Sequence, residues 1–258
     1  MFKELIIHIQ DVSLKSEVVG FDFTFILLHI YKKNQAQREQ YSPLFITFAS
    51  QPLKHRIMKI LIIGGTGTIS SAITRQLAES EHELWLLNRG NRKQEVPANV
   101  KQIVANIDDE ADVLRQIGDT MFDAVCEFIG FVTEQVERDH RLFAGRTRQY
   151  VYISSASAYA KPVRNYIINE GTSLCNPHWE YSRNKIACEE LLMKYYREEG
   201  FPVTIIRPSH TYCERSVPVG LHGLKGSWQV LKRMMEGKPV IVHGDGSSLW
   251  TMTFNEDF

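Results

Sequence analysis

The sequence has few cysteines, and their spacing suits neither a disulfide framework nor a metal site. No two of them form a C-x-x-C pair, and none belongs to a histidine cluster with the spacing of a zinc site. We therefore predict no metal centre. We expect reduced thiols in a cytoplasmic protein, because the cytoplasm keeps thiols reduced. The four residues are Cys126, Cys175, Cys188 and Cys213.

The sequence also lacks an excess of charge of either sign and a long hydrophobic run. Its 258 residues include 30 Lys+Arg and 30 Asp+Glu, so no net charge attracts nucleic acid or an anionic membrane. The longest apolar run near the N-terminus, residues 18–31, contains Asp22 and His29 and is too short to cross a bilayer. We therefore expect no membrane association, and the neutral charge disfavours a nucleic-acid partner, which would need a local basic patch.

Residues 1–57 differ in pattern from the remainder of the chain. They contain irregular apolar clusters and a polar stretch from Lys32 to Gln40, without a sustained period. Met58 then opens the run Lys59–Gly65, a start that is typical of nucleotide-binding domains. The N-terminal extension is either an additional element or an upstream stretch included by a wrong start. Both interpretations stay open, and we assign the extension no role.

From Met58 onward, short β-branched runs alternate with helical patterns, as in parallel sheets whose strands are joined by helical crossovers. The apolar runs Ile60–Ile63 and Val203–Ile206 suit strands that are buried on both faces. We predict an α/β fold with a doubly wound parallel sheet of the Rossmann type. The expected strands are residues 59–63, 83–87, 101–104, 124–128, 149–153 and 203–207, with helices beginning near residues 68, 109, 133 and 178.

A glycine-rich turn, residues 64–70 (Gly-Gly-Thr-Gly-Thr-Ile-Ser), lies directly after the first of these strands and before a helical stretch. Glycine lets the backbone turn tightly and approach a pyrophosphate, whose charge then rests on amide N–H groups at the helix N-terminus. Ser70 replaces the third glycine of the usual pattern and is still small enough for close helix packing. An ordinary strand-to-helix turn is the alternative. The predicted cofactor contacts here are Gly64, Gly67, Thr68 and Ile69.

The end of the next strand carries basic residues and no acid. A ribose with a free 2′-hydroxyl is usually held by an acidic residue at this position, whereas an arginine accommodates the 2′-phosphate of NADP. Arg89, Arg92 and Lys93 therefore favour NADP over NAD, with Asn88 and Arg89 as the predicted contacts. The alternative is a solvated basic loop without a ligand.

A third pattern suits acid/base chemistry: Ser154–Tyr159 follows one strand, and Tyr181–Lys185 opens a helical stretch. Tyr181 and Lys185 are four residues apart, so on a helix they share a face and an ammonium can lie near the phenol. A free tyrosine has a pKa of about 10, and a nearby cation favours the phenolate and lowers that pKa. Ser155 can hydrogen-bond the same substrate oxygen. Chance matches to Tyr-x-x-x-Lys are common, and the preceding glycine turn is what gives this one weight.

Together these segments resemble the extended short-chain dehydrogenase/reductases, the NAD-dependent epimerase/dehydratase family. Further matches are the runs Arg207–Tyr212 and Gly237–Gly246, and the resemblance covers residues 58–258. It implies a Rossmann domain for NAD(P) at residues 58–207 and part of a smaller substrate lobe at residues 208–258. Family members continue beyond the position of Phe258, so we expect this lobe to be incomplete.

The resemblance also implies roles for individual residues. Tyr181 would be the acid/base, Lys185 would bind the nicotinamide ribose and lower the pKa of Tyr181, and Ser155 would orient the substrate. The backbone just past Pro208 would lie against the nicotinamide, and Asn106 could hydrogen-bond adenine.

The function implied is that of an NAD(P)-dependent epimerase/dehydratase or reductase. It would act by hydride transfer on a hydroxyl or carbonyl group of a sugar-like substrate, nucleotide sugars included. Residues 189–199 fit an amphipathic helix with a solvated charged face. In this family the helix that carries the Tyr and Lys often packs against its twin, so the same face could form a homodimer.

The chain departs from the family pattern at several positions. Glu127–Gly130 stands in place of a small-residue stretch, which puts cofactor contacts there in doubt, and Asn106 stands where an acid is often found. His210 and Trp250 replace an asparagine and a phosphate-binding arginine of sugar-nucleotide epimerases, so a UDP-sugar is less favoured. The alternative function is a catalytically impaired dinucleotide-binding module with a regulatory or RNA-associated role. This alternative arises because Asn88–Gly90 and Trp250 resemble an atypical branch of the family, which includes proteins similar to the chloroplast stem-loop RNA-binding ribonucleoproteins.

Overall fold

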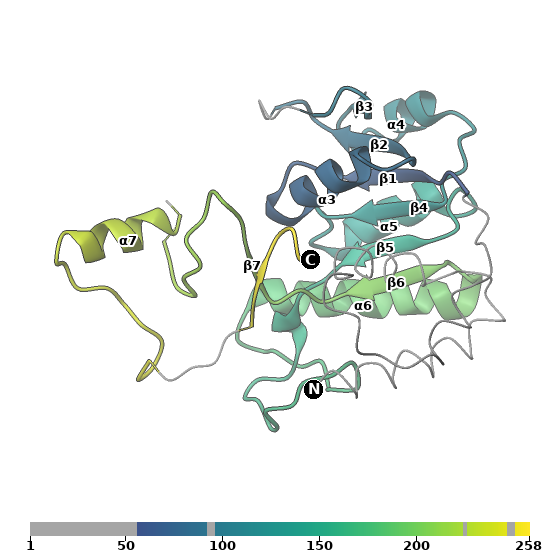
Figure 1. Ribbon diagram of the computed structural model, residues 1–258. Coiled ribbons are helices and arrows are strands. Elements are labelled where there is room, and N and C mark those ends of the chain that lie inside the picture. The colour runs from purple at the N-terminus through teal and green to yellow at the C-terminus, as the bar shows by residue number, and fades with distance from the viewer. Residues whose placement is uncertain (1–55, 92–95, 224–225, 247–250) are drawn as a thin grey trace, which may run out of the picture. The chain divides into compact units, whose positions relative to one another are not determined.

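Six parallel strands form the central sheet of the computed structural model, which describes residues 56–258 except 92–95, 224–225 and 247–250 (Figure 1). Their order is β3-β2-β1-β4-β5-β6, so the chain moves outward from β1 in one direction and from β4 in the other. This order confirms the predicted doubly wound α/β fold. The strands are β1 Lys59–Ile63, β2 Glu83–Asn88, β3 Lys101–Val104, β4 Ala124–Glu127, β5 Tyr150–Ile153 and β6 Val203–Ile206.

All six predicted strands are present, with bounds that differ from the prediction by at most one residue at an end. β4 ends at Glu127 rather than Phe128, because the Glu127 side chain accepts a hydrogen bond from the amide of Ile129 and turns the chain there. Three basic or aromatic residues of the sequence analysis lie outside the described residues, as does the N-terminal extension up to residue 55: Arg92, Lys93 and Trp250.

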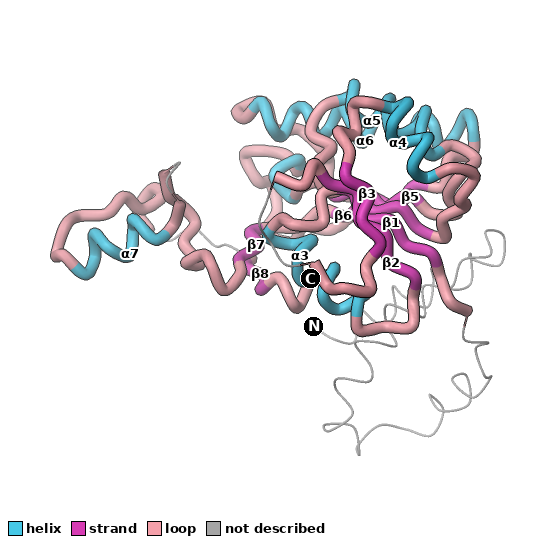
Figure 2. The backbone as a smooth tube through the Cα atoms, turned by 90° about the horizontal axis from the view of Figure 1, so that it is seen from above, coloured by secondary structure: helices cyan, strands magenta, loops and turns pink. Residues whose placement is uncertain are grey.

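Helices cover both faces of the sheet (Figure 2). On one face lie α4 (Glu110–Ile117), α5 (Thr133–Phe143) and α6 (Glu180–Glu199), and on the other lies α3 (Thr68–Ala78). The side chains of β1 alternate between the two cores: Leu61 and Ile63 face α4, α5 and α6, whereas Ile60 and Ile62 share a cluster with α3. β1 is therefore buried on both faces, as its apolar sequence predicts.

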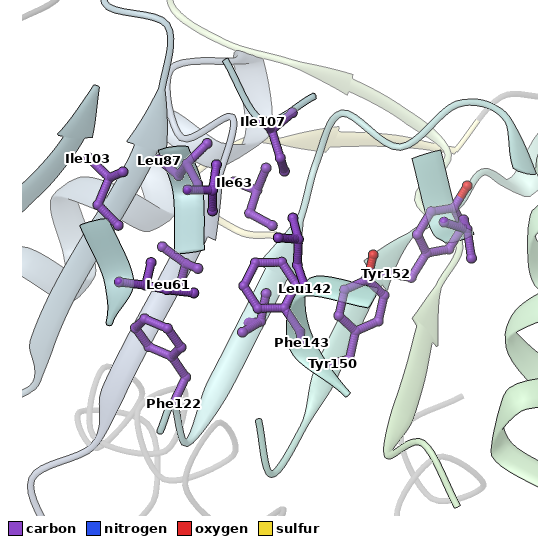
Figure 3. Packing of buried hydrophobic residues seen from close by; sticks show 14 of the residues in the cluster. Leu61, Ile63, Leu87, Ile103, Ile107, Phe122, Leu142, Phe143, Tyr150 and Tyr152 are labelled. Atoms are coloured by element: carbon purple, nitrogen blue, oxygen red, sulfur yellow. The ribbon is translucent and has the colours of Figure 1, made fainter. Parts of the chain in front are cut away.

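The larger core lies between the sheet and helices α4, α5 and α6 (Figure 3). Four aromatic side chains, Phe122, Phe143, Tyr150 and Tyr152, are fully buried there among aliphatic side chains. Burying one such side chain contributes about 1.5–3 kcal/mol to stability. The packed sheet is thus a firm support for the loops at its carboxyl edge.

The C-terminal part contains a second, two-stranded sheet and one helix. β7 (His210–Tyr212) pairs in parallel with β8 (Met252–Phe254), and between them lies α7 (Trp228–Met235), none of whose side chains is buried. Nδ2 of Asn255 donates a hydrogen bond to the carbonyl of Thr68 at 3.0 Å. This segment therefore contacts the first turn of α3, and the domain boundary at residue 207 stays a prediction.

Candidate active site

A pocket of about 720 Å³ opens at the carboxyl ends of the strands, where the chain reverses direction between β1 and β4. In doubly wound sheets this is where ligands bind. The structure brings all of the predicted site residues to this pocket, although their roles in binding and catalysis stay predictions. The lining includes Gly64, Gly67, Thr68, Ile69, Asn88, Arg89, Asn106, Ser155, Tyr181, Lys185 and Pro208.

The turn after β1 packs so closely against its neighbours that two of its positions have no room for a side chain. Gly64 has φ of +79°, and a Cβ atom added to it would lie 2.5 Å from Cγ2 of Ile129. A Cβ on Gly65 would collide with Leu86 of β2. Thr68 and Ile69 at the N-terminus of α3 line the pocket directly after this turn. In the predicted binding mode, a pyrophosphate would rest on the backbone amides at this helix N-terminus.

The hydroxyl of Ser70 makes two hydrogen bonds across this turn, a role that the sequence analysis did not predict. Its Oγ donates a hydrogen bond to the carbonyl of Gly64 at 2.8 Å and accepts one from the amide of Gly67 at 2.9 Å. The side chain is buried and spans the turn from the first turn of the helix. A glycine at this position could make neither bond, so the serine stabilises the turn as well as permitting close packing.

The residues predicted to contact the adenosine of the cofactor line the pocket at the ends of β2 and β3. Oδ1 of Asn88 accepts a hydrogen bond from the amide of Gly90 at 2.8 Å, and this turn presents the exposed Arg89. Asn106 follows β3, and its Oδ1 accepts a weak hydrogen bond from the amide of Asp108 at 3.4 Å. Because Arg92 and Lys93 lie outside the described residues, the structure shows only Arg89 of the three predicted cations at this pocket.

Lys185 is the most buried member of the predicted catalytic group, with 1% of its surface exposed. Its Nζ donates hydrogen bonds to the carbonyls of Gly130 at 2.6 Å and Ile153 at 2.7 Å. The same atom lies 4.6 Å from the ring centroid of Tyr152 and 5.8 Å from that of Tyr181. Burial lowers the pKa of Lys185 to about 8, so its charge is sensitive to its surroundings.

The pKa of Tyr181 is raised, which is the reverse of the shift expected from the sequence. The cause is burial of the phenol, whose ring lies 4.7 Å from that of Trp179 and 6.3 Å from that of Phe131. Interaction with the Ser155 hydroxyl lowers the pKa and only partly offsets burial. The ammonium of Lys185 faces two carbonyls rather than the phenol oxygen, so it does not produce the expected lowering.

Ser155 is held at the start of a short 3-10 helix, Ala156–Ala158. Its Oγ accepts a hydrogen bond from the amide of Ser157 at 3.1 Å and donates one to Oγ of Ser157 at 2.9 Å. Ser157 in turn accepts from Oγ of Ser182 on α6 at 2.9 Å. This chain of hydroxyls connects the loop after β5 to the helix that carries Tyr181.

An ion pair that the sequence did not predict joins β6 to α6. Arg207 directs its guanidinium to the carboxylate of Glu189, with Nη2 2.6 Å from Oε2 and Nε 3.0 Å from Oε1. Ser154 donates a further hydrogen bond to the same carboxylate. Glu189 is buried, so its expected place on a solvated helix face was wrong. The amphipathic pattern of a helix does not reveal that one of its charged residues pairs with a residue from a distant part of the chain.

The loop after β4 was also missed as part of the site. Glu127 is fully buried, and its carboxyl accepts a hydrogen bond from the amide of Ile129. Gly130 presents its carbonyl to Lys185 and to the Tyr152 hydroxyl, the latter at 2.9 Å. The only sequence signal was the departure from the family's small residues at Glu127–Gly130.

The described residues offer neither a metal-binding group of side chains nor a helix suited to spanning a membrane. Across this part of the chain, no group of three or more His, Cys, Asp or Glu side chains is placed to hold a metal ion. Nor does any helix there have the length and apolar character needed to cross a membrane. All four cysteines are free thiols. His210 in β7 has a lowered pKa, caused by burial and by the nearby His222.

Comparison with known proteins places this geometry in a family. Residues 60–258 match the model of the NAD dependent epimerase/dehydratase family. A trifunctional UDP-glucose 4,6-dehydratase/UDP-4-keto-6-deoxy-D-glucose 3,5-epimerase/UDP-4-keto-L-rhamnose-reductase of Arabidopsis thaliana is 29% identical over 114 residues, which cover 44% of this chain and 16% of that protein. The chloroplast stem-loop binding protein of 41 kDa b of the same plant is 26% identical over 244 residues, covering 87% and 58%.

Solved structures share the fold. The dTDP-glucose 4,6-dehydratase of Bacillus anthracis, determined in complex with NAD, superimposes with a TM-score of 0.62 at 20% identity, over 77% of this chain and 68% of that one. The chain spans only 16% and 58% of the lengths of the two Arabidopsis relatives.

Proposed function

The chain belongs to the NAD-dependent epimerase/dehydratase family, and we propose that it is an NAD(P)-dependent epimerase/dehydratase or reductase whose substrate is sugar-like, nucleotide sugars included. The observation that carries the proposal is that the glycine turn, Ser155, Tyr181 and Lys185 line one pocket. Pockets at this edge of a doubly wound sheet suit a dinucleotide lying across the reversal point.

NAD(P), when bound, supplies the hydride acceptor or donor for a substrate carbon. Tyr181 exchanges the proton of the substrate hydroxyl through its phenol oxygen, and Ser155 orients the same substrate oxygen. Lys185 binds the nicotinamide ribose, and the backbone after Pro208 borders the nicotinamide. Because burial raises the pKa of Tyr181, the phenol holds its proton at neutral pH, which favours proton donation to a carbonyl oxygen over proton removal.

The test is a calorimetric titration of the full chain with NADPH and NADH, followed by a screen of sugar nucleotides and small carbonyl compounds for turnover. Tyr181→Phe then separates catalysis from binding: kcat should fall by about 10²–10⁴-fold, while the Kd for cofactor stays within about threefold, because the ring is retained. Turnover that survived in this variant would remove Tyr181 from the mechanism. Binding of neither nucleotide by the folded chain would contradict the proposal as a whole.

The cofactor preference that we propose is for NADP over NAD, through Arg89. Its guanidinium is exposed at the pocket rim and is presented by the turn that Asn88 closes. Arg89→Asp should weaken NADPH binding at least about tenfold and NADH binding less than about threefold, because only NADPH carries the 2′-phosphate. Equal weakening of both nucleotides would refute the assignment.

A second candidate is a dinucleotide-binding module with a regulatory or RNA-associated role. The similarity to the chloroplast stem-loop binding protein over 87% of this chain favours it. The chain's formal net charge of zero does not. Tight cofactor binding without turnover, together with salt-sensitive binding of a stem-loop RNA, would favour this candidate over the enzyme.

The remaining proposals concern assembly and location. We propose a homodimer formed through α6, and a cytoplasmic protein. Sedimentation of the full chain would test the first, and fractionation of cells would test the second.

A further inference from the structure

The loop after β4, Phe128–Phe131, contacts both halves of the pocket. The side chain of Ile129 fills the space beside Gly64 in the glycine turn. The carbonyl of Gly130 accepts a hydrogen bond from Nζ of Lys185 at 2.6 Å. The ring centroid of Phe131 lies 4.9 Å from the same Nζ. The position of this one loop therefore affects both the packing of the glycine-rich turn after β1 and the surroundings of Lys185.

Glu127 packs directly beneath the loop. It is fully buried at the end of β4, and Oε1 accepts a hydrogen bond from the amide of Ile129. At Gly130 an added Cβ would lie 3.1 Å from the ring of Tyr152 and 3.2 Å from Cγ of Glu127. The loop is thus pressed against the Glu127 side chain as well as bonded to it.

The other carboxyl oxygen of Glu127 faces a second buried acid. No described residue donates a hydrogen bond to Oε2, which lies 3.8 Å from Nη2 of Arg138 and beside the Asp139 carboxyl. Asp139 accepts from Nε of Arg138 at 2.9 Å and from the hydroxyl of Tyr150 at 2.6 Å. The ionisable groups around Glu127 are Arg138 and Asp139 from α5, Cys126 from β4, Tyr150 and Tyr152 from β5 and Lys185 from α6.

This arrangement requires a proton. Two ionised carboxyls beside one buried guanidinium would leave an uncompensated buried charge, which is costly. Asp139 already accepts three hydrogen bonds suited to a carboxylate, two from Arg138 and one from Tyr150, whereas Oε2 of Glu127 lacks a donor among the described residues. A proton on Oε2 gives Glu127 a hydrogen bond to donate toward Asp139. Burial and the Asp139 charge accordingly raise the pKa of Glu127 well above its ordinary value.

We propose that Glu127, as a neutral carboxylic acid, is a positioning residue. It holds the loop Phe128–Phe131 so that the Gly130 carbonyl accepts from Lys185 and Ile129 lies against the glycine turn. The functional part of this inference rests on the proposed function, because it assigns Lys185 and the glycine turn to cofactor binding. The small residues usual in the family at this position have no carboxyl group. They could neither accept from the Ile129 amide nor donate toward Asp139.

Two variants of Glu127 separate positioning from bulk. Glu127→Gln keeps an oxygen acceptor for the Ile129 amide and an N–H donor toward Asp139, whereas Glu127→Ala removes both. Leu142→Ala is the matched control, because Leu142 is a fully buried α5 side chain in the same core without a hydrogen bond to the loop. Each full-length variant is measured by amide hydrogen exchange without cofactor, and by calorimetry with NADH and NADPH at pH 7.

In Glu127→Ala, the amides of residues 129–131 should exchange at least about tenfold faster relative to those of β1, and the Kd should rise at least about tenfold. Glu127→Gln should stay within about twofold of wild type in both measurements. Leu142→Ala should keep relative exchange in the loop and the Kd within about threefold, although it is less stable. If Glu127→Ala does not fold, Glu127→Met takes its place, since it fills a similar volume without hydrogen bonding.

Unchanged loop exchange in Glu127→Ala would overturn the inference, and so would a glutamine variant as impaired as the alanine variant. If wild type bound neither nucleotide, the proposed function would fail, while the exchange rates would still decide whether Glu127 holds the loop. Wild-type binding with altered loop exchange but an unchanged Kd in Glu127→Ala would overturn the link from the loop to the cofactor.

Discussion

Two loops border the same pocket at the point where the sheet reverses, and they are built in opposite ways. The turn after β1 consists of residues without large side chains and closes on itself, with the amide of Thr66 donating to the carbonyl of Gly64 at 2.8 Å. The loop after β4 is held by side chains at its ends: Glu127 accepts from the amide of Ile129, and Gln135 accepts from the amide of Phe131 at 2.6 Å.

The two loops meet where Ile129 lies against Gly64. The first loop carries the predicted pyrophosphate contacts, and the second packs against it through Ile129 and accepts a hydrogen bond from Lys185 through the Gly130 carbonyl. A site of this kind depends as much on a buried carboxyl behind the pocket as on the glycines in front of it.

The largest effect should come from closing the contact between the loops. Gly64→Ala places a side chain at φ of +79° and against Ile129, so we expect about 3 kcal/mol of destabilisation and a severe loss of cofactor affinity. The matched control is Gly200→Ala at the end of α6, where φ is +71° in the left-handed region but an added Cβ meets nothing within 4 Å. That variant should lose about 1–2 kcal/mol and keep its affinity. Urea unfolding and calorimetry measure both, and equal effects would mean that the Ile129 contact is unimportant.

The protonation state of Glu127, beneath the loop after β4, can be tested through the pH dependence of the unfolding free energy. Because the pKa of Glu127 is raised on folding, the folded chain holds more protons than the unfolded chain above about pH 4.5, and wild-type stability falls as pH rises toward the folded pKa. Glu127→Gln cannot ionise. The unfolding free energy of Glu127→Gln should therefore increase relative to that of wild type as the pH rises above 5, by at most about 1.4 kcal/mol for each pH unit. Urea unfolding curves that shift in parallel would contradict a protonated Glu127.

The smallest effect concerns how the first loop closes. Ser70→Ala removes the hydrogen bonds to Gly64 and Gly67, so it should cost about 1 kcal/mol and weaken cofactor binding about threefold. Ser80→Ala is the control, because Ser80 makes comparable bonds to the carbonyl of Leu77 and the amide of His82 beyond the other end of α3. It should lose similar stability with unchanged affinity. Weaker cofactor binding in both variants would mean that the loss of affinity comes from a general disturbance of α3 rather than from the Ser70 hydrogen bonds.

The difference between the loops also explains what sequence reasoning could predict. Gly64–Ser70 is a local pattern between a strand and a helix, so its place and its conformation follow from neighbouring residues. Tyr181 and Lys185 are likewise linked by helical spacing alone. The doubly wound parallel fold followed from the alternation of apolar runs and helices, and all six predicted strands are present.

The remainder depended on contacts between distant elements. Glu127 meets Asp139 and Arg138 of α5, and Glu189 meets Arg207, which directly follows β6. An isolated glutamate in a strand or helix pattern carries no information about such partners. The raised pKa of Tyr181 was missed for the same reason. It depends on burial of the phenol, while the Lys185 ammonium donates to the carbonyl of Gly130 in the loop after β4 and to that of Ile153 in β5.

The pair of Arg207 and Glu189 has a mechanical consequence. Arg207 directly precedes Pro208, and Glu189 lies two helical turns beyond Tyr181, so the bidentate contact clamps the end of β6 to α6. A tilt of α6 that displaced the phenol would carry the Pro208 backbone with it. The Arg207–Glu189 pair thereby couples the spacing between these two walls of the pocket to the orientation of one helix.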